Sequence, residues 1–351
     1  MIKREQTRPV YLRGIKLGGQ SKVLIQSMAS RKTSHLEEVI PQINECQRLG
    51  CDIMRLSVLD EDDAKAFKDI RSATSIPLVA DIHFDYRLAL LALENGADAI
   101  RINPGNIGSE DRVKAVVDSC KAHNAPIRIG VNSGSLDRSI YQGKDTIKSK
   151  YLVESAKKHV AILEKFGFED IVISLKGSDA IETIESYKLA SEVFPYPLHL
   201  GITESGPKDI GLLRSAAGLS PLLLSGIGDT IRISLSEDPQ EEVKACCRLL
   251  HDLRLYDDYP TFISCPTCGR TDVDLIPTAK AIEKYLSDHK IAKTIAVMGC
   301  VVNGPGEARH ADLGCAGGRN GRWVIFKKGE VILETDNDHI VSEMIRLINA
   351  L

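Results

Sequence analysis

Five basic side chains stand inside short apolar segments that lie far apart in the chain. They are Arg55, Arg101, Arg128, Lys176 and Arg232. Burying a cation without a partner costs several kcal/mol, so each one needs a counter-charge or an anionic ligand. A structural network with Asp81, Glu204 and Asp229 is one alternative. Because the five cations outnumber these three acids, the second alternative, a ligand with several negative charges, is favoured. The planar guanidinium of arginine can form paired hydrogen bonds with phosphate oxygens. The sequence therefore predicts a substrate that carries a phosphate or a diphosphate.

Three further side chains near these cations could move a proton. Glu204 in the segment TESG could take or give one, or it could neutralise Lys176 or Arg232. His83 and His199 could be general acids or bases, or they could be hydrogen-bonded core residues.

The carboxyl-terminal part carries a cysteine pattern that is typical of a metal site. Cys265 and Cys268 form a CxxC, Cys300 lies in a glycine-rich loop, and Glu307 follows in NGPGE. A zinc ribbon needs a second CxxC, which this chain lacks. Three thiolates suit an iron–sulfur cube in which one iron is left for another ligand. A carboxylate such as that of Glu307 would be a labile ligand for this iron. In the alternative, Cys315 is the fourth ligand of a closed structural site.

The elements that must position the cations are eight short apolar, β-branched segments that alternate with helical patterns. This alternation predicts parallel strands buried on both faces, and eight units match a (β/α)8 TIM barrel, whose site lies at the carboxyl ends of its strands. An open doubly wound sheet is the alternative. The expected strands are Val23–Gln26, Ile53–Ser57, Leu78–Asp81, Ala99–Ile102, Ile127–Val131, Ile171–Leu175, Leu198–Ile202 and Thr230–Ser234.

Two domains are expected. Residues 1–255 form the barrel domain, with a hairpin at 9–19 that would plug its bottom, and residues 260–351 form a small α/β metal domain. In the second domain we expect helices at about 277–289 and 343–351, and strands at 294–297, 323–326 and 331–333.

Composition narrows the class of protein. The chain has 351 residues, of which 43% are hydrophobic, and a net charge of −3. That balance gives no drive toward nucleic acid or anionic membrane, and no segment is long and apolar enough to span a bilayer. The polar start and the odd number of cysteines, nine, argue against export and a disulfide framework. We therefore expect a cytoplasmic protein.

A family resemblance covers nearly the whole chain. The motifs QSM, DIHF, RINPGNIG, RIGVNSGSL, LKGSD, LGITESG, GIGDTIRISL, CPTCGR and MGCVVNGPGEARHADLGCAGG occur in this order. Together they resemble bacterial 4-hydroxy-3-methylbut-2-enyl diphosphate synthase of the non-mevalonate isoprenoid pathway. The resemblance implies a TIM barrel followed by a [4Fe–4S] domain.

The resemblance also implies roles for individual residues. Cys265, Cys268, Cys300 and Glu307 match the cluster ligands, and Cys315 stands where family members often have an aliphatic residue. Glu204, Asn132 and Asn303 match residues that contact the substrate. The diphosphate-binding positions fall on Arg55, Arg101, Arg128, Lys176, Arg232 and Ser234.

The implied reaction is the two-electron reduction of 2-C-methyl-D-erythritol 2,4-cyclodiphosphate, with ferredoxin or flavodoxin as the donor and Glu204 as the acid that assists loss of hydroxyl. Two rival classes stay open. One is a non-redox barrel enzyme that acts on a phosphate ester and carries a structural zinc domain. The other is an iron–sulfur module that binds RNA or another partner, which the net charge disfavours.

Chain geometry predicts a dimer. The helix at about 239–253 must run from the mouth of the barrel to the bottom, about 22 Å, and the linker 254–261 reaches only about 28 Å. A cluster held by this linker should lie far from the mouth of the barrel in the same chain. The sequence thus predicts a head-to-tail homodimer in which each barrel uses the cluster of the other chain, and the resemblance implies the same.

Overall fold

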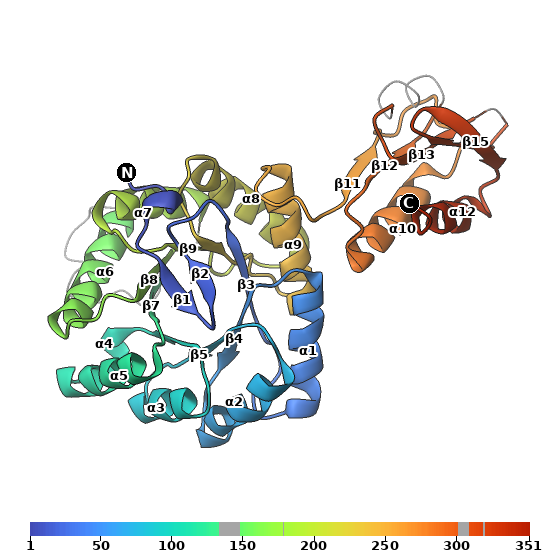
Figure 1. The fold of residues 1–351 in the computed structure, drawn as a ribbon. Helices are drawn as coiled ribbons and strands as arrows, with labels where there is room; N and C mark the ends of the chain where they lie inside the picture. Colours follow the sequence, from blue (N-terminus) through green and yellow to red (C-terminus); the bar gives the residue numbers. More distant parts are fainter. Residues whose placement is uncertain (133–147, 178, 301–308, 319) are drawn as a thin grey trace. The chain divides into compact units, whose positions relative to one another are not determined.

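The computed structural model describes residues 1–351 apart from 133–147, 178, 301–308 and 319 (Figure 1). The chain divides into two compact units, Met1–Leu255 and Tyr256–Leu351. Among the described helices, none combines the length and the apolar character that a membrane crossing requires.

The first unit is a barrel of eight parallel strands in the order β8-β7-β6-β5-β4-β3-β10-β9. A parallel bridge between Ile173 and Leu198 joins β8 to the segment that enters β9 and closes the ring. The predicted TIM barrel is confirmed, and the open doubly wound sheet is wrong. The strands are β3 (Leu24–Met28), β4 (Ile53–Ser57), β5 (Leu78–Asp81), β6 (Ala99–Ile102), β7 (Ile127–Asn132), β8 (Ile171–Lys176), β9 (His199–Leu200) and β10 (Thr230–Ile231).

Helices surround this barrel (Figure 1), and local chemistry sets their ends. The Asp60 carboxylate accepts the Asp63 N–H at the start of α2, and Gly50 ends α1 with a left-handed φ of 114°. The helices are α1 (Leu36–Leu49), α2 (Glu61–Ala73), α3 (Tyr86–Glu94), α4 (Pro104–Ile107), α5 (Glu110–His123), α6 (Lys148–Lys165), α7 (Ala180–Val193), α8 (Lys208–Leu224) and α9 (Pro239–Asp252).

A hairpin closes the amino-terminal end of the barrel. Strands β1 (Val10–Leu12) and β2 (Ile15–Leu17) pair antiparallel and lie across the opening in Figure 1. Their apolar side chains pack against the first residues of several strands, among them Leu24, Ile53 and Ala99. Full burial of a Leu or Val side chain contributes about 1.5–3 kcal/mol. This apolar floor leaves the opposite, carboxyl-terminal end of the barrel for a site.

The second unit is a five-stranded sheet in the order β11-β12-β13-β14-β15. The first three strands are parallel, and the last two pair antiparallel. Helices α10 (Leu275–His289) and α12 (Ile340–Ile348) contribute buried residues to the same apolar core as the sheet. The strands are β11 (Thr261–Ser264), β12 (Thr294–Met298), β13 (Leu313–Gly317), β14 (Trp323–Lys327) and β15 (Glu330–Thr335).

Candidate active site

The five predicted cations come together at the carboxyl-terminal mouth of the barrel. They line one cavity of about 330 Å³ that opens to solvent. Ser234 lies on its wall as well. The full lining is Met28, Arg55, Asp81, His83, Arg101, Arg128, Gly130, Ser174, Lys176, Thr203, Arg232 and Ser234.

Asp81 at the end of β5 is the acid among the described residues that line this cavity. Its carboxylate lies 3.2 Å from Arg101 Nη1 and 3.6 Å from Arg55 Nε. Burial alone would raise the pKa of Asp81, but the surrounding basic side chains, Arg55 and Arg101 foremost, together outweigh that effect and hold the pKa below its usual range. Asp81 is therefore ionised and balances part of the charge of these two cations.

Glu242 of α9 is a second acid behind the cavity, and sequence reasoning missed it. Its carboxylate accepts hydrogen bonds of 2.9 Å from both Nε and Nη2 of Arg232. The side chain is only 3% exposed. The one signal in the sequence was a charged residue on the buried face of an amphipathic helix, next to Val243 and Cys246.

The other two predicted acids do not pair with these cations. Asp229 precedes β10 at the closed end, where it accepts from Thr7 Oγ1 at 2.7 Å and from the Leu198 N–H at 2.8 Å. The network expected around Asp229 is thus wrong, because this residue lies on the floor side of its strand. Glu204 is exposed in the loop after β9, with a left-handed φ of 54°.

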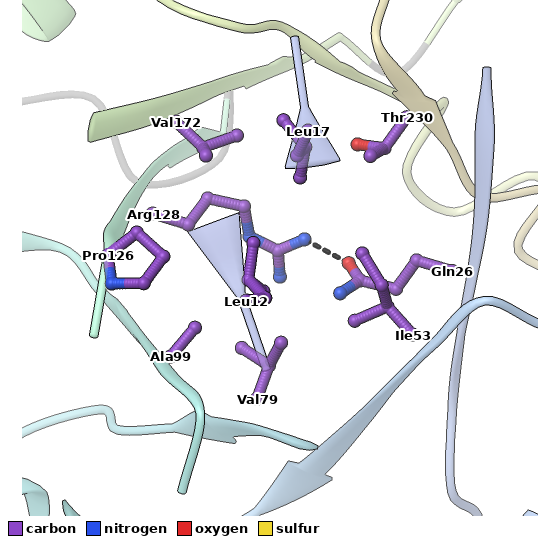
Figure 2. Close-up of a pocket in the computed structure, with 10 residues that line it drawn as sticks. All are labelled: Leu12, Leu17, Gln26, Ile53, Val79, Ala99, Pro126, Arg128, Val172 and Thr230. Carbon is purple, nitrogen blue, oxygen red and sulfur yellow. Dashed lines mark hydrogen bonds between the residues drawn. The ribbon is translucent and has the colours of Figure 1, made fainter. Parts of the chain in front are cut away.

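Arg128 and Lys176 have no carboxylate partner among the described residues. Arg128 Nη1 donates to Gln26 Oε1, a neutral acceptor, and its Nε and Nη2 lack hydrogen-bond partners in the described part of the chain (Figure 2). Burial, aided by the neighbouring cations, lowers the pKa of both residues well below the ordinary values. Their charges are therefore costly until an anion enters the cavity.

Arg128 also reaches the interior beneath the mouth. Figure 2 shows its guanidinium between the hairpin residues Leu12 and Leu17 in this view, next to Gln26. The small cavity there is about 20 Å³, enough for one water molecule. Arg128 thus lines both the mouth cavity and this small void.

Two glycines leave room for the cations. A Cβ on Gly130 of β7 would lie 2.6 Å from Arg101 Nε, and one on Gly201 would lie 3.1 Å from Lys176 Nζ. Neither glycine has a positive φ, so backbone freedom does not explain the residue type. These positions instead shape the space that the basic side chains fill.

Charge and shape together indicate what the cavity binds. Five cations face two carboxylates, Asp81 and Glu242, within the described residues around it. The excess positive charge in a largely buried site favours a ligand with several negative charges. The geometry therefore fits an anion with the charge of a diphosphate.

The remaining predicted residues of the barrel are placed as follows. His83 Nε2 lies 3.7 Å from Asp81 Oδ2 on the cavity wall. His199 is buried with Nδ1 2.7 Å from Thr230 Oγ1, and burial beside Arg128 lowers its pKa, so its ring is neutral. Asn132 ends β7, but its side chain lies outside the described part of the structure.

The second unit brings two cysteine loops together at one end of its sheet. Cys265 directly follows β11 and Gly299-Cys300 directly follows β12, and these strands are parallel neighbours with Ser264 opposite Val297. The Gly299 N–H donates to Cys265 Sγ at 3.0 Å. Such N–H···S contacts are typical of cysteines that hold iron–sulfur clusters.

Cys268 is exposed and chemically prepared to be a ligand. Hydrogen bonds from the backbone and side chain of Arg270 lower the pKa of its thiol, which favours the thiolate that binds metal. The hydrogen bond with Cys268 and the charges of Cys268 and Cys300 raise the pKa of Arg270, so the two thiols share one basic neighbour.

Cys315 has the opposite character. Its side chain is fully buried on β13 within the core of the second unit, and burial raises its pKa. Glu307 and Asn303 lie outside the described residues. In the described part of the chain, no three His, Cys, Asp or Glu side chains are grouped closely enough to hold one metal ion. The donor set still fits a cluster, because three thiols stand on loops and two of those loops are joined at one end of the sheet.

Comparison with known families identifies the chain. The GcpE TIM-barrel domain matches residues 7–247, and the GcpE protein C-terminal domain matches residues 261–350. The chain belongs to the GcpE family. GcpE relatives cover its full length: one from Clostridium perfringens is 53% identical over 352 residues, 100% of each chain. One from Fusobacterium nucleatum is 49% identical over 345 residues, 98% of this chain and 97% of the relative. Both are named 4-hydroxy-3-methylbut-2-en-1-yl diphosphate synthase (flavodoxin), so the resemblance seen in the sequence is confirmed.

Solved structures add information on the fold alone. Dihydropteroate synthase from Yersinia pestis aligns with a TM-score of 0.51 at 13% identity, over 70% of this chain and 98% of that chain. Phospho-2-dehydro-3-deoxyheptonate aldolase from Thermotoga maritima aligns with a TM-score of 0.50 at 13% identity, over 72% and 75%. The shared feature of this GcpE protein and these enzymes is the barrel.

Proposed function

We propose that this protein reduces 2-C-methyl-D-erythritol 2,4-cyclodiphosphate to 4-hydroxy-3-methylbut-2-enyl diphosphate. The observation that carries the proposal is the mouth cavity, where five cations face two carboxylates in the described residues. Its full-length relatives are named for the same product and for flavodoxin.

The reaction needs two electrons. The bond between C2 and the bridging phosphate oxygen breaks, the C3 hydroxyl leaves as water, and the two electrons form the C2–C3 double bond. Two protons balance the change, one for the water and one for the released diphosphate oxygen. The diphosphate stays on the carbon that carried its other ester bond.

The barrel binds and orients the diphosphate. Arg55, Arg101, Arg128, Lys176 and Arg232 supply the charge and Ser234 a hydroxyl. Because Arg128 and Lys176 have no carboxylate partner among the described residues, they gain most when an anion enters. Asn132 and Asn303 complete the set of substrate contacts in this proposal.

Glu204 is the proposed acid for the leaving hydroxyl. It lies in the loop between β9 and α8, next to Thr203 of the cavity wall. Its left-handed backbone conformation costs a non-glycine residue about 1–2 kcal/mol. A carboxylate kept in such a strained loop position supports a functional role.

Cys265, Cys268, Cys300 and Glu307 are the proposed ligands of a [4Fe–4S] cluster. When bound, the cluster supplies electrons one at a time. The thiol pKa of Cys268, lowered by Arg270, supports the assignment, as does the N–H···S bond to Cys265. Cys315 is excluded from the set because its side chain belongs to the apolar core.

Flavodoxin is the electron donor in this proposal, since the relatives' names specify it, and ferredoxin is the alternative. A cytoplasmic location and the lack of a nucleic-acid partner stay predictions from the sequence. So does the division of labour between a substrate domain and a cluster domain.

A head-to-tail homodimer completes the proposal. Within the first unit, α9 runs the length of the barrel. Its Glu242 bonds Arg232 at the mouth, whereas Cys247 Sγ donates to the carbonyl of Leu49 at the far end of α1. Residues 256–260 then span at most about 18 Å. This short linker is the reason to propose that the cluster serves the barrel of a second chain, and two-fold symmetry closes such a pair.

An anaerobic assay tests the reaction. Protein reconstituted with iron and sulfide is mixed with the cyclodiphosphate and dithionite, and ³¹P NMR follows the phosphorus signals. We expect the cyclic diphosphate to become a linear one. A colourless zinc protein that hydrolyses the ester without reductant would instead establish the non-redox alternative.

A mixing experiment tests the dimer. Arg128→Ala chains and Cys300→Ser chains, each inactive alone, are combined and the heterodimer is isolated with two affinity tags. Recovery of activity is expected, because one intact barrel then meets one intact cluster. Heterodimers without activity, or full activity in a proven monomer, would contradict the shared site.

A further inference from the structure

Glu242 uses both carboxylate oxygens inside the protein. Oε2 accepts from Arg232 Nε at 2.9 Å and from Ser27 Oγ at 2.8 Å. Oε1 accepts from Arg232 Nη2 at 2.9 Å and from the Leu235 N–H at 3.1 Å. Four hydrogen bonds on one buried carboxylate fix its position, so it can hold the plane of a guanidinium.

The orientation of Arg232 follows from this fork. One edge of its guanidinium, Nε and Nη2, faces Glu242, and the remaining nitrogen, Nη1, lies 3.7 Å from Met28 Sδ on the cavity wall. Nη1, the nitrogen that does not bond Glu242, is thus directed toward the cavity and can donate to a ligand. Glu242 itself does not line that cavity.

Met28 orients a second arginine in a similar way. Its Sδ accepts from Arg55 Nη2 at 2.7 Å and from Arg55 Nε at 3.1 Å. A thioether is only a weak acceptor and carries no charge. It can therefore direct the guanidinium without neutralising it, and a phosphate oxygen competes with it easily.

Gln26 orients a third arginine, Arg128. Its Oε1 accepts from Arg128 Nη1 beneath the mouth, as Figure 2 shows, and Gln26 is 4% exposed. Gln26, Ser27 and Met28 are consecutive in β3, which contributes no cation to the cavity. Each of them contacts a different part of the basic cluster or its counter-charge.

We propose that Gln26, Ser27 and Met28 of β3, with Glu242 of α9, form a positioning layer that orients Arg128, Arg55 and Arg232 for the bound diphosphate. The layer rests on the proposed function. It consists of positioning residues, because Gln26, Ser27 and Glu242 act through the arginines. The QSM segment of the sequence thereby acquires a role.

The test compares Glu242→Gln with Glu241→Gln. Both residues lie in the first turn of α9, but Glu241 pairs with Lys208 and Lys244, away from the cavity. Binding of the cyclodiphosphate and of inorganic pyrophosphate is measured by calorimetry, and turnover by the anaerobic assay. A melting curve of each variant serves as the control for folding.

We expect Glu242→Gln to raise Kd and KM about tenfold or more, as for a lost partner of a buried charge. kcat should change by less than about threefold, because the lost orientation weakens substrate and transition state alike. Ser27→Ala, the smaller change, should raise Kd about threefold. If Glu242→Gln does not fold, the Kd of Ser27→Ala tests the positioning layer in its place. Glu241→Gln should leave both constants unchanged.

Two results would overturn the inference, and they are distinguishable. If the unsubstituted protein neither binds nor converts the cyclodiphosphate, the proposed function fails and the positioning layer with it. If it does both, while folded Glu242→Gln or Ser27→Ala binds with unchanged Kd, the positioning layer alone is wrong. A merely structural role would lower the melting temperature without that change in Kd.

Discussion

Gly130→Ala should damage the anion site through one specific neighbour. The added Cβ would lie 2.6 Å from Arg101 Nε, 2.7 Å from Nη2 and 3.0 Å from Cζ. Contacts this short do not occur in folded proteins, so the guanidinium must move. Arg101 is only 12% exposed and is paired with Asp81 at 3.2 Å, which leaves it little alternative space.

The size of the effect follows from what Arg101 loses. A charge-assisted contact in a desolvated site is worth about 2–4 kcal/mol, which corresponds to about 30- to 1000-fold in affinity. We expect KM for the cyclodiphosphate to rise by a factor in this range. The cluster content should be unchanged, because Gly130 belongs to the first unit.

A double-mutant cycle is the suitable assay. KM and pyrophosphate affinity are measured for Gly130→Ala, Arg101→Ala and the double variant. If the methyl group acts by displacing Arg101, it should cost little once Arg101 is already alanine. A loss in the Arg101→Ala background as large as in the native background would refute the reasoning, since the damage would then come from the strand itself.

Four further substitutions test other parts of the structure. Cys315→Ala should keep the iron content and activity, whereas Cys300→Ser should lose iron; an iron-free Cys315→Ala protein that is still folded would contradict the ligand assignment. Burial raises the pKa of Asp229 from 3.8 to about 6, so the folded state holds a proton that the unfolded state releases. Asp229 therefore contributes about 3 kcal/mol to the free energy of unfolding. This contribution is present below pH 4 and is lost as pH rises through 6. The free energy of unfolding of Asp229→Asn, measured with urea, should therefore rise relative to that of the native chain as pH increases from 4 to 7. A difference between the two proteins that stays constant over this range would contradict the prediction. Glu204→Gly should abolish turnover yet unfold at the same or a higher temperature, because glycine relaxes the left-handed backbone; an active Glu204→Gly enzyme would remove the proposed acid.

Much of the barrel could be predicted because its strands are short apolar runs with clear polar ends. The strands at 53–57, 78–81 and 99–102 have the predicted bounds. The convergence of the cations followed from the rule that the carboxyl ends of barrel strands meet at one mouth. For such strands, sequence pattern and tertiary burial agree.

Two strands of the second unit were missed for an identifiable reason. β13 reads Leu-Gly-Cys-Ala-Gly, small residues with little strand propensity. The structure uses them because neighbours approach closely: a Cβ on Gly314 would lie 2.4 Å from the Phe326 ring. β11 (Thr261–Ser264) directly precedes the CxxC, so the metal-site motif obscures its short strand pattern in the sequence.

Counter-charges were the least predictable part of the site. Asp229 stands three residues before Arg232 in sequence but bonds the amino-terminal segment at the floor. Glu242 lies on the next helix, and no pattern in the sequence indicates which cation it faces. Such pairs depend on how a helix docks against the barrel, which only the folded structure determines.

Electron counting tests the central claim most directly. Anaerobic protein with the cyclodiphosphate is titrated with fully reduced flavodoxin, and the donor oxidised is compared with the allylic diphosphate formed. The account predicts two electrons consumed for each molecule of product. An iron-loaded protein that binds the cyclodiphosphate but forms no allylic diphosphate, or forms product without consuming electrons, would contradict it.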